Sequence, residues 1–310
     1  MPTFLITSAT GRQGASTARI LLAQGHKVHA LVRDTTSPAS LDLQSLGAIL
    51  FGGGFDDVAS INAAIKGVDG VFLNTFPNLQ DPNGETRTAE TFVAAARAAG
   101  TVKSFVVSTV FRANEQEDWS KLKDDFPFLS LYFTSKSGVE KVIRASGFTY
   151  TILRPGWLMH NYIGFATSFH WPDYPTKRLI TVSVPREWQL DHFDAADVGQ
   201  FAAAALLEPE RYRGKEIDLV SEWFTFDEVA KHLSDTIGAE VKVKYRTPEE
   251  TAEARKKLPT IERQLYASGG HEKTRPDAST LAAYGFRLTT FREFLEREKS
   301  EIRKTVGIDA

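Results

Sequence analysis

The sequence predicts an α/β fold, in which a doubly wound parallel sheet is followed by a smaller α/β lobe. Its first half alternates short β-branched runs with longer helical patterns, which is typical of βαβ units. After Arg154-Pro155-Gly156 this alternation stops, and aromatic residues and prolines crowd into "GWLMHNYIGFATSFHWPDYP". We therefore expect a first domain over residues 1–155, to which segments near 190–220 return, and a second over 156–310.

The elements of the first half follow from hydrophobic periodicity. Strands are predicted at Thr3–Thr7, Lys27–Val32, Ala48–Phe51, Gly70–Leu73, Ser104–Ser108 and Tyr150–Leu153. Helices are predicted at Ala15–Gln24, Val58–Ile65, Gly84–Ala99 and Tyr132–Ala145. The glycines of "AAGTV" and "ASGF" stand where a left-handed cap would end the third and fourth helices.

The second half begins with loops and short elements, which we interpret as the surroundings of a pocket. Regular order then returns, with helices at Ala195–Leu206 and Thr225–Ile237 and strands at Glu216–Val220 and Val241–Tyr245. Two further helices are predicted in "TPEETAEARKKL" and "TTFREFLEREKSEIRKTV".

Composition excludes several classes of protein. The 37 basic and 39 acidic residues give a net charge of −2, and no run of lysine or arginine would bind a nucleic acid backbone. The absence of cysteine excludes disulfides and thiolate metal sites, and no histidines have a metal-binding spacing. No apolar stretch approaches the roughly 18 residues of a membrane span, and we expect no secretory signal, since the first residues have no basic region followed by an apolar core and a small-residue cleavage site. We expect a cytoplasmic protein without bound metal.

The turn after the first strand, "TSATGRQGAST", has the spacing Ser8-x-x-Gly11-x-x-Gly14. Gly11 and Gly14 allow close approach of an anion and packing of the next helix on the sheet, as in dinucleotide-binding loops. Ser8 stands at the first glycine position, so it has to adopt the conformation of the turn. The left-handed conformation is less available to serine than to glycine. The loop predicts dinucleotide binding in a Rossmann-type domain; the alternative is an ordinary glycine-bearing turn.

The end of the second strand predicts which dinucleotide binds. In "ALVRD", Arg33 stands where NAD-binding proteins usually have an acid and NADP-binding proteins a base. The planar guanidinium suits a 2′-phosphate, which favours NADP(H). The alternative is an exposed pair of Arg33 with Asp34.

The segment "YFTSK" contains the main catalytic candidates. Tyr132 and Lys136 are four residues apart, so on a helix they share a face. A nearby ammonium lowers the pKa of a tyrosine and allows proton transfer to a carbonyl oxygen. Ser108, at the end of its strand, is the candidate hydroxyl at the carboxyl edge of the sheet, with Thr109 as an alternative. The alternative for the pair is chance spacing among the eight tyrosines.

A substrate pocket is expected around "RPGWLMHN". Trp157, His160 and Asn161 lie in this segment, and Phe111 follows the fifth strand. The aromatic residues of this region, such as Phe111 and Trp157, fit either a flat apolar substrate or the core beneath long loops. The alternative for His160 is a structural role. In "DHFDAADVG", Asp194 is interpreted as a helix N-cap and Asp197 as a first-turn acid, in preference to a carboxylate cluster with Asp191.

The chain resembles the NmrA-like family of atypical short-chain dehydrogenases/reductases over nearly its whole length. The resemblance is carried by "ATGRQG", "ALVRD", "DDVASINAAIKGVDGVF", "SKSGVEKVIRASGFTYTILRPGWLMHN" and "DAADVG". It implies an NADP(H) site with Thr10 and Gln13 near the phosphates and Arg33 near the 2′-phosphate. It also implies that Lys136 approaches the nicotinamide ribose and that Pro155, in "RPGW", lies by the nicotinamide.

The sequence departs from the family at three positions. Ser8 replaces the first glycine. Gly54 stands where the family commonly has an aspartate, so adenine contacts are expected from the backbone or Phe55. Tyr132 stands where many relatives carry histidine or another residue, and it restores the proton-transfer pair of the superfamily.

Three functions are compatible with these residues. The first is an NADPH-dependent reductase of a bulky or aromatic carbonyl, imine or enone, with Tyr132 as proton donor. The second is a regulator that senses NADP(H) without turnover, and the third is a non-redox isomerase or dehydratase. The expected partners are a small-molecule substrate, a second copy of the chain, or a protein that the chain regulates.

Overall fold

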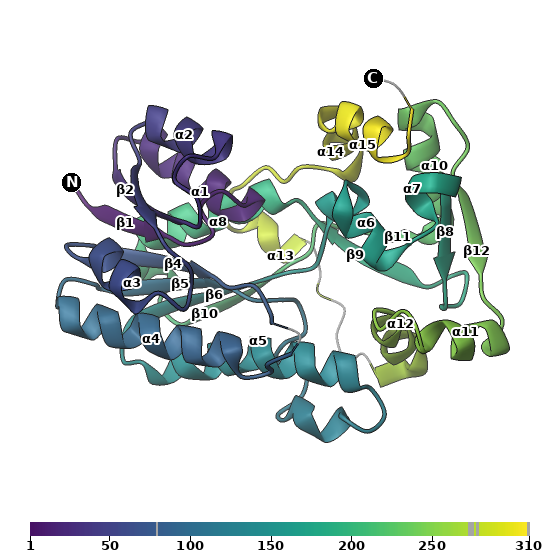
Figure 1. Ribbon diagram of the computed structural model, residues 1–310, viewed down its shortest axis with the longest axis horizontal. Helices are drawn as coiled ribbons and strands as arrows, with labels where there is room; N and C mark the ends of the chain where they lie inside the picture. Colours follow the sequence, from purple (N-terminus) through teal and green to yellow (C-terminus); the bar gives the residue numbers. More distant parts are fainter. Residues whose placement is uncertain (79, 272–275, 277–278, 309–310) are drawn as a thin grey trace. The chain divides into compact units, whose positions relative to one another are not determined.

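The structure is a computed structural model that describes residues 1–78, 80–271, 276 and 279–308. The chain divides into two units, and Figure 1 labels most of the helices and strands of each. Unit 1 consists of Met1–Asp118, Leu131–Pro155 and Ala195–Leu219, and unit 2 of Trp119–Ser130, Gly156–Asp194 and Val220–Ala310. Residues 119–130, which the sequence prediction assigned to the first domain, thus belong to unit 2.

Unit 1 is built on a seven-stranded parallel sheet in the order β10-β6-β5-β4-β1-β2-β3. The strands are β1 (Thr3–Ile6), β2 (Lys27–Val32), β3 (Ile49–Gly52), β4 (Gly70–Asn74), β5 (Ser104–Ser108), β6 (Thr149–Pro155) and β10 (Lys215–Leu219). Central strands of a parallel sheet are buried on both faces, which is why β5 is buried at every position. The predicted α/β fold class with a Rossmann-type sheet is confirmed.

Helices cover both faces of this sheet. They are α1 (Arg12–Ala23), α2 (Pro38–Ser45), α3 (Val58–Ile65), α4 (Gly84–Ala99), α5 (Pro127–Ala145), α8 (Ala195–Leu207) and α9 (Pro209–Tyr212). Figure 1 shows α1, α2 and α8 on one face and α3, α4 and α5 on the other. At Gly199 of α8 a Cβ would lie 2.3 Å from Ser16 Oγ, so this glycine allows α8 to approach α1 closely.

Unit 2 contains two short sheets. In the first, β9 (Gln189–Phe193) pairs with β7 (Trp157–Leu158) in parallel and with β11 (Glu222–Thr225) in antiparallel orientation. In the second, β8 (Leu179–Val182) and β12 (Lys242–Tyr245) are parallel. The unit has its own core of buried side chains, which includes Leu233 and Phe291.

The helical elements of unit 2 are short. They are η1 (Trp119–Leu122), η2 (Met159–Tyr162), α6 (Phe165–His170), α7 (Tyr174–Lys177), α10 (Phe226–Ile237), α11 (Pro248–Arg255), α12 (Ile261–Tyr266), η3 (Ala267–His271), α13 (Ser279–Ala282), α14 (Phe291–Arg297) and α15 (Lys299–Thr305). Capping boxes begin α10, α11 and α14. Within the described part of the chain, no helix is long and apolar enough to cross a membrane.

Several elements differ from the prediction. The sequence analysis missed α2, where only Ser40 and Leu43 are buried and the apolar pattern is therefore weak. It also missed β8, β9 and β11. The final predicted helix is two helices, because the chain leaves helical geometry at Glu298, which ends α14 and precedes α15.

Candidate functional site

The candidate site lies at the carboxyl edge of the sheet in unit 1. There β5, β4 and β1 are neighbours, and their ends are joined by hydrogen bonds. Thr7 Oγ1 accepts a hydrogen bond from the backbone N–H of Asn74 at 2.8 Å, and Ser8 Oγ donates to the Asn74 carbonyl at 2.9 Å. Open α/β sheets bind ligands at this edge, so the loops after β1, β4 and β5 are the candidates.

Ser8 adopts the left-handed conformation that the sequence pattern required of it. Its φ is 47°, and its carbonyl accepts the Gly11 N–H at 2.8 Å to close the turn. A non-glycine residue in this conformation costs free energy, and the hydrogen bond from Ser8 Oγ to Asn74 offsets part of that cost. The turn after β1 therefore forms with serine at the first glycine position.

Gly14 lets the chain pass close to its own backbone. A Cβ on this residue would lie 2.3 Å from the Ser8 carbonyl oxygen and 2.9 Å from the Thr7 carbonyl oxygen. Gly11, the N-cap of the 12-residue helix α1, has no side chain that could cap the first turn. Tight glycine packing and an uncapped helix start fit the pyrophosphate of a dinucleotide.

Arg33 is exposed at the end of β2. It makes no hydrogen bond or ion pair with any residue that the structure describes. Asp34 instead accepts hydrogen bonds from the Thr36 hydroxyl at 2.6 Å and its N–H at 2.8 Å, which hold the pKa of Asp34 below its usual value. The alternative pair of Arg33 with Asp34 is therefore not formed, and the guanidinium is available for a phosphate.

Two other residues expected at the cofactor have less defined surroundings. Thr10 is exposed in the glycine loop. Phe55 is half-buried after β3, with its ring edge-to-face against Phe92 of α4 at a centroid distance of 6.1 Å. Their cofactor contacts, and that of buried Pro155 at the end of β6, stay predictions.

Tyr132 and Lys136 lie beside one another on α5. The Lys136 ammonium nitrogen is 6.0 Å from the centroid of the Tyr132 ring. The tyrosine is half-buried, whereas Lys136 is only 4% exposed. A buried ammonium requires hydrogen-bond partners, because burial of an unpaired charge is expensive.

Glu85 is the main partner of Lys136. Lys136 Nζ donates to Glu85 Oε1 at 2.7 Å and to the Thr75 carbonyl at 3.1 Å. Ser135 Oγ donates to Glu85 Oε2 at 2.7 Å, and the Thr75 hydroxyl donates to Glu85 Oε1. We call Glu85, Lys136, Ser135 and Thr75 the Glu85 cluster. It brings together the end of β4, the first turn of α4 and the middle of α5.

The Glu85 cluster changes what the lysine can do. Its positive charge is compensated by a buried carboxylate, so the net charge beside the Tyr132 ring is smaller than the sequence pattern indicated. An ammonium has three N–H groups, and Glu85 and Thr75 accept two of them. The third is left for a ligand oxygen such as a ribose hydroxyl.

The candidate hydroxyl of Ser108 is also engaged. Ser108 is 1% exposed, and its Oγ donates to Gln13 Oε1 at 2.7 Å. Thr109 is 7% exposed and donates to Glu140 Oε1 at 2.7 Å, while Glu140 is paired with buried Arg154 at 2.8 Å. Ser108 therefore links the glycine loop to β5. Holding a substrate oxygen would require Ser108 to redirect its proton, for example after rotation of the Gln13 amide.

The residues expected in the substrate pocket fall in different units. Phe111, in unit 1, is 3% exposed and packs under the Arg112 guanidinium at 4.5 Å. Trp157, His160 and Asn161 are half-buried in unit 2. The Trp157 ring lies edge-to-face on His170 at 4.5 Å. Their role toward a substrate stays a prediction.

The three acids of "DHFDAADVG" are held by structural partners. Asp191 accepts from the Trp157 N–H at 2.8 Å, and Asp194 pairs with Arg297 at 2.7 Å. Asp197 accepts from the Gln200 amide at 2.8 Å. Among the described residues, no group of three histidines and acids could hold a metal ion.

Sequence reasoning missed Glu85 and Thr75. The sequence indicates that Glu85 lies in the first turn of α4, where a carboxylate commonly interacts with the helix dipole. Nothing local indicates that it turns inward to a lysine 51 residues later. Thr75 contributes its carbonyl as well as its hydroxyl, and a backbone acceptor leaves no signal in a sequence.

Comparison with known proteins agrees with this geometry. The chain matches the NmrA-like family over residues 2–294. The NmrA-like family domain-containing oxidoreductase cpsB of Aspergillus campestris is 27% identical over 260 residues, which cover 76% of this chain and 73% of that protein.

Two solved structures share the fold over nearly the whole chain. Nmra, a negative transcriptional regulator, in complex with NAD, has a TM-score of 0.74 at 20% identity and covers 99% of this chain and 98% of its own. The triphenylmethane reductase of Citrobacter sp., complexed with NADP(H), has a TM-score of 0.69 at 22% identity and covers 96% of this chain and 99% of its own. The expected resemblance is confirmed by the family match, and the chain belongs to the NmrA-like family.

Proposed function

We propose that this chain is an NADPH-dependent reductase of a bulky or aromatic carbonyl, imine or enone. The observation that carries the proposal is the half-buried phenol of Tyr132 beside the buried Lys136 ammonium at the carboxyl edge of the sheet. The similarity to an NmrA-like oxidoreductase and the fold shared with a reductase complexed with NADP(H) support it. A pure cofactor sensor would need no proton donor at this position.

The residues that would hold NADPH are distributed along the carboxyl edge. The backbone from Gly11 to Gly14 would accommodate the pyrophosphate, and the Arg33 guanidinium would bind the 2′-phosphate. The remaining N–H of Lys136 would donate to the nicotinamide ribose. When bound, NADPH supplies a hydride to an electrophilic carbon of the substrate.

Tyr132 would complete the reduction by proton transfer. As the carbonyl carbon gains the hydride, the C=O π bond breaks and its electron pair takes the proton of Tyr132 Oη, which gives an alcohol. The tyrosinate then regains a proton from water, since the side chain is half-buried and not enclosed. In this scheme Glu85 is a positioning residue, because it acts through Lys136 and touches no reacting atom.

A titration with cofactor and substrates tests the proposal. Oxidation of NADPH is followed by nicotinamide absorbance with a panel of quinones, aromatic aldehydes, imines and enones. We expect turnover with at least one class. NADPH binding without oxidation by any of them would favour the regulatory function, and conversion of a substrate without NADPH consumption would favour an isomerase or dehydratase.

Arg33→Ala tests the choice of cofactor. Loss of charge-assisted hydrogen bonds to a phosphate is expected to weaken NADPH binding by roughly tenfold to a hundredfold and to leave NADH binding unchanged. Lys66→Ala removes one positive charge from an exposed position of the same unit and serves as the control. Equal NADPH affinity in Arg33→Ala and in the control would contradict the 2′-phosphate assignment.

A further inference from the structure

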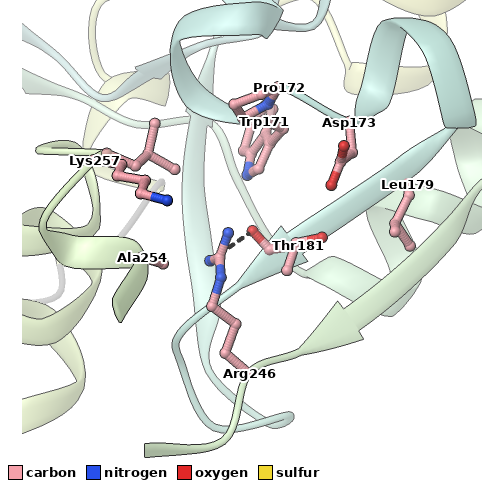
Figure 2. Close-up of a pocket in the computed structure, with 9 residues that line it drawn as sticks. Trp171, Pro172, Asp173, Leu179, Thr181, Arg246, Ala254 and Lys257 are labelled. Atoms are coloured by element: carbon pink, nitrogen blue, oxygen red, sulfur yellow. Dashed lines mark hydrogen bonds between the residues drawn. The ribbon is translucent and has the colours of Figure 1, made fainter. Parts of the chain in front are cut away.

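Unit 2 contains a cavity of about 190 Å³ that no part of the proposed reductase function uses. Figure 2 shows it between β8, β12 and the end of α11. Its apolar walls are Pro172, Leu179, Ala254 and Leu258, and its polar lining is Trp171, Asp173, Thr181, Arg246 and Lys257. All of these residues belong to unit 2.

The indole N–H of Trp171 is a buried donor without an acceptor in the described part of the chain. Trp171 is 2% exposed, and its Nε1 makes no hydrogen bond with any residue that the structure describes. Figure 2 shows this nitrogen on the side of the ring that faces Arg246. An unsatisfied buried N–H is costly, so an acceptor in the cavity would lower the free energy of the site.

The Arg246 guanidinium lies at the cavity and forms no ion pair with any residue that the structure describes. Its Nη1 donates to the Thr181 carbonyl at 3.1 Å and to Ser183 Oγ at 3.3 Å. Its Nε and Nη2 make no hydrogen bond to another described residue. Burial lowers the pKa of Arg246, because the loss of hydration outweighs the attraction of the guanidinium to Glu250 and Asp173.

The two carboxylates that attract the Arg246 guanidinium, Asp173 and Glu250, are each also paired with a lysine. Asp173 pairs with Lys177 at 3.0 Å, and Glu250 pairs with Lys244 at 2.7 Å. Lys257 is exposed at the edge of the cavity and has no ion pair among the described residues. Among the described residues, Arg246 and Lys257 therefore give the lining one more positive charge than the carboxylate of Asp173 offsets.

We propose that this cavity binds a small organic monocarboxylate. The free edge of the Arg246 guanidinium is a planar pair of donors that matches a carboxylate in a bidentate arrangement, and Trp171 Nε1 supplies a third hydrogen bond. The apolar walls accommodate a short hydrocarbon or ring, whereas a phosphate would leave oxygens facing apolar atoms. The volume is below the roughly 300–1,000 Å³ of pockets for drug-sized ligands, which limits the ligand to a small molecule.

The experiment is a titration of the full-length protein with benzoate, butyrate, benzamide and inorganic phosphate at constant ionic strength. Binding is measured by calorimetry and by tryptophan fluorescence, to which Trp171 contributes directly. We expect benzoate or butyrate to bind and benzamide, the neutral analogue, to bind at least about tenfold more weakly, because a hydrogen bond to a charged group is stronger.

Variants assign the binding to the cavity. Arg246→Met is expected to weaken carboxylate binding by about tenfold or more, and Trp171→Phe by about threefold to tenfold, because it removes one neutral donor and keeps the ring. Lys257→Met changes an exposed side chain, so it tests the site without risk to folding; a loss of about twofold to fivefold is expected. Arg292→Met, at an exposed arginine of α14, is the control and should bind as the wild type does.

Four results would overturn the proposal. Three concern the wild-type protein: the absence of any carboxylate binding, equal affinities for benzoate and benzamide, and phosphate binding that is as tight as carboxylate binding. Carboxylate affinities that stay unchanged in both Lys257→Met and Trp171→Phe would also overturn it. None of these measurements involves NADPH, so their failure is distinct from failure of the proposed reductase function.

Discussion

Replacing Lys136 with methionine removes the cation of the Glu85 cluster and leaves a buried carboxylate without its partner. The two side chains are only 5% and 2% exposed, so water cannot replace the lost interaction. Removing one partner of a buried ion pair costs about 3–5 kcal/mol. That is a large share of the roughly 5–15 kcal/mol by which a native domain is stable.

The double variant Glu85→Gln/Lys136→Met separates this folding cost from catalysis. Glutamine keeps an oxygen for the Thr75 hydroxyl and an amide group that Ser135 can accept from, while no charge stays buried. We therefore expect the double variant to be no less stable than Lys136→Met alone. A double-mutant cycle would then give a coupling free energy of about 3 kcal/mol between Glu85 and Lys136.

Urea unfolding measures these differences in each unit. All five tryptophans belong to unit 2, whereas the Glu85 cluster belongs to unit 1. Far-ultraviolet circular dichroism reports on both units and tryptophan fluorescence on unit 2. We expect Lys136→Met to lower the midpoint by circular dichroism more than the midpoint by fluorescence.

Lys141→Met is the matched control on the same helix. Lys141 is exposed, and among the residues that the structure describes its Nζ donates only to the Glu117 carbonyl, at 3.3 Å. Its replacement should change stability by no more than about 0.5 kcal/mol. The conclusion that Glu85 and Lys136 form a buried, coupled pair would be refuted by two results together. Lys136→Met would change the free energy of unfolding no more than Lys141→Met does, and the effects of Glu85→Gln and Lys136→Met would add in the double variant.

Three further predictions follow from single residues. Ser8→Ala loses the hydrogen bond to Asn74 and keeps the left-handed strain, so it should destabilise unit 1 by about 1 kcal/mol. Ser8→Gly should be nearly neutral, because glycine loses the hydrogen bond but also removes the strain. Equal urea midpoints for the two variants would contradict this prediction. Burial lowers the pKa values of His170 and His192 from 6.5 to about 4. Between these two pH values both histidines are protonated in the unfolded state but neutral in the folded state, so the folded state becomes less stable as the pH falls. Unit 2 should lose about 2 kcal/mol for each histidine at about pH 5, measured by fluorescence-detected urea unfolding, and His170→Gln should remove half of that loss. In Arg33→Ala, isothermal calorimetry should show weaker binding of NADPH and unchanged binding of NADH.

Much of unit 1 could be predicted because its periodicity is strong. β2, β5, α3 and α4 have the bounds that the sequence analysis gave, since buried parallel strands are continuous apolar runs and the helices between them are amphipathic. The conformation of Ser8 also followed from its place in the glycine spacing. Here local pattern and tertiary structure require the same arrangement.

The short elements of unit 2 could not be predicted in the same way. β9, with the sequence QLDHF, contains an acid and a histidine that are both buried, because Asp191 accepts the Trp157 N–H and His192 bonds to the Tyr162 hydroxyl at 2.9 Å. Such tertiary partners override the polar appearance of the strand. The Glu85 cluster escaped prediction for the same reason, since its members are far apart in the sequence.

The most direct test of the proposed reductase is the turnover of Tyr132→Phe with a substrate that the wild type reduces. We expect NADPH affinity to stay within about twofold of the wild type, because the phenylalanine ring keeps the packing, and kcat to fall by a hundredfold to ten-thousandfold, the range typical of a lost general acid. Tyr150→Phe, at a tyrosine of β6, is the control and should keep full activity. Full turnover in Tyr132→Phe would contradict the assignment of Tyr132 as the proton donor.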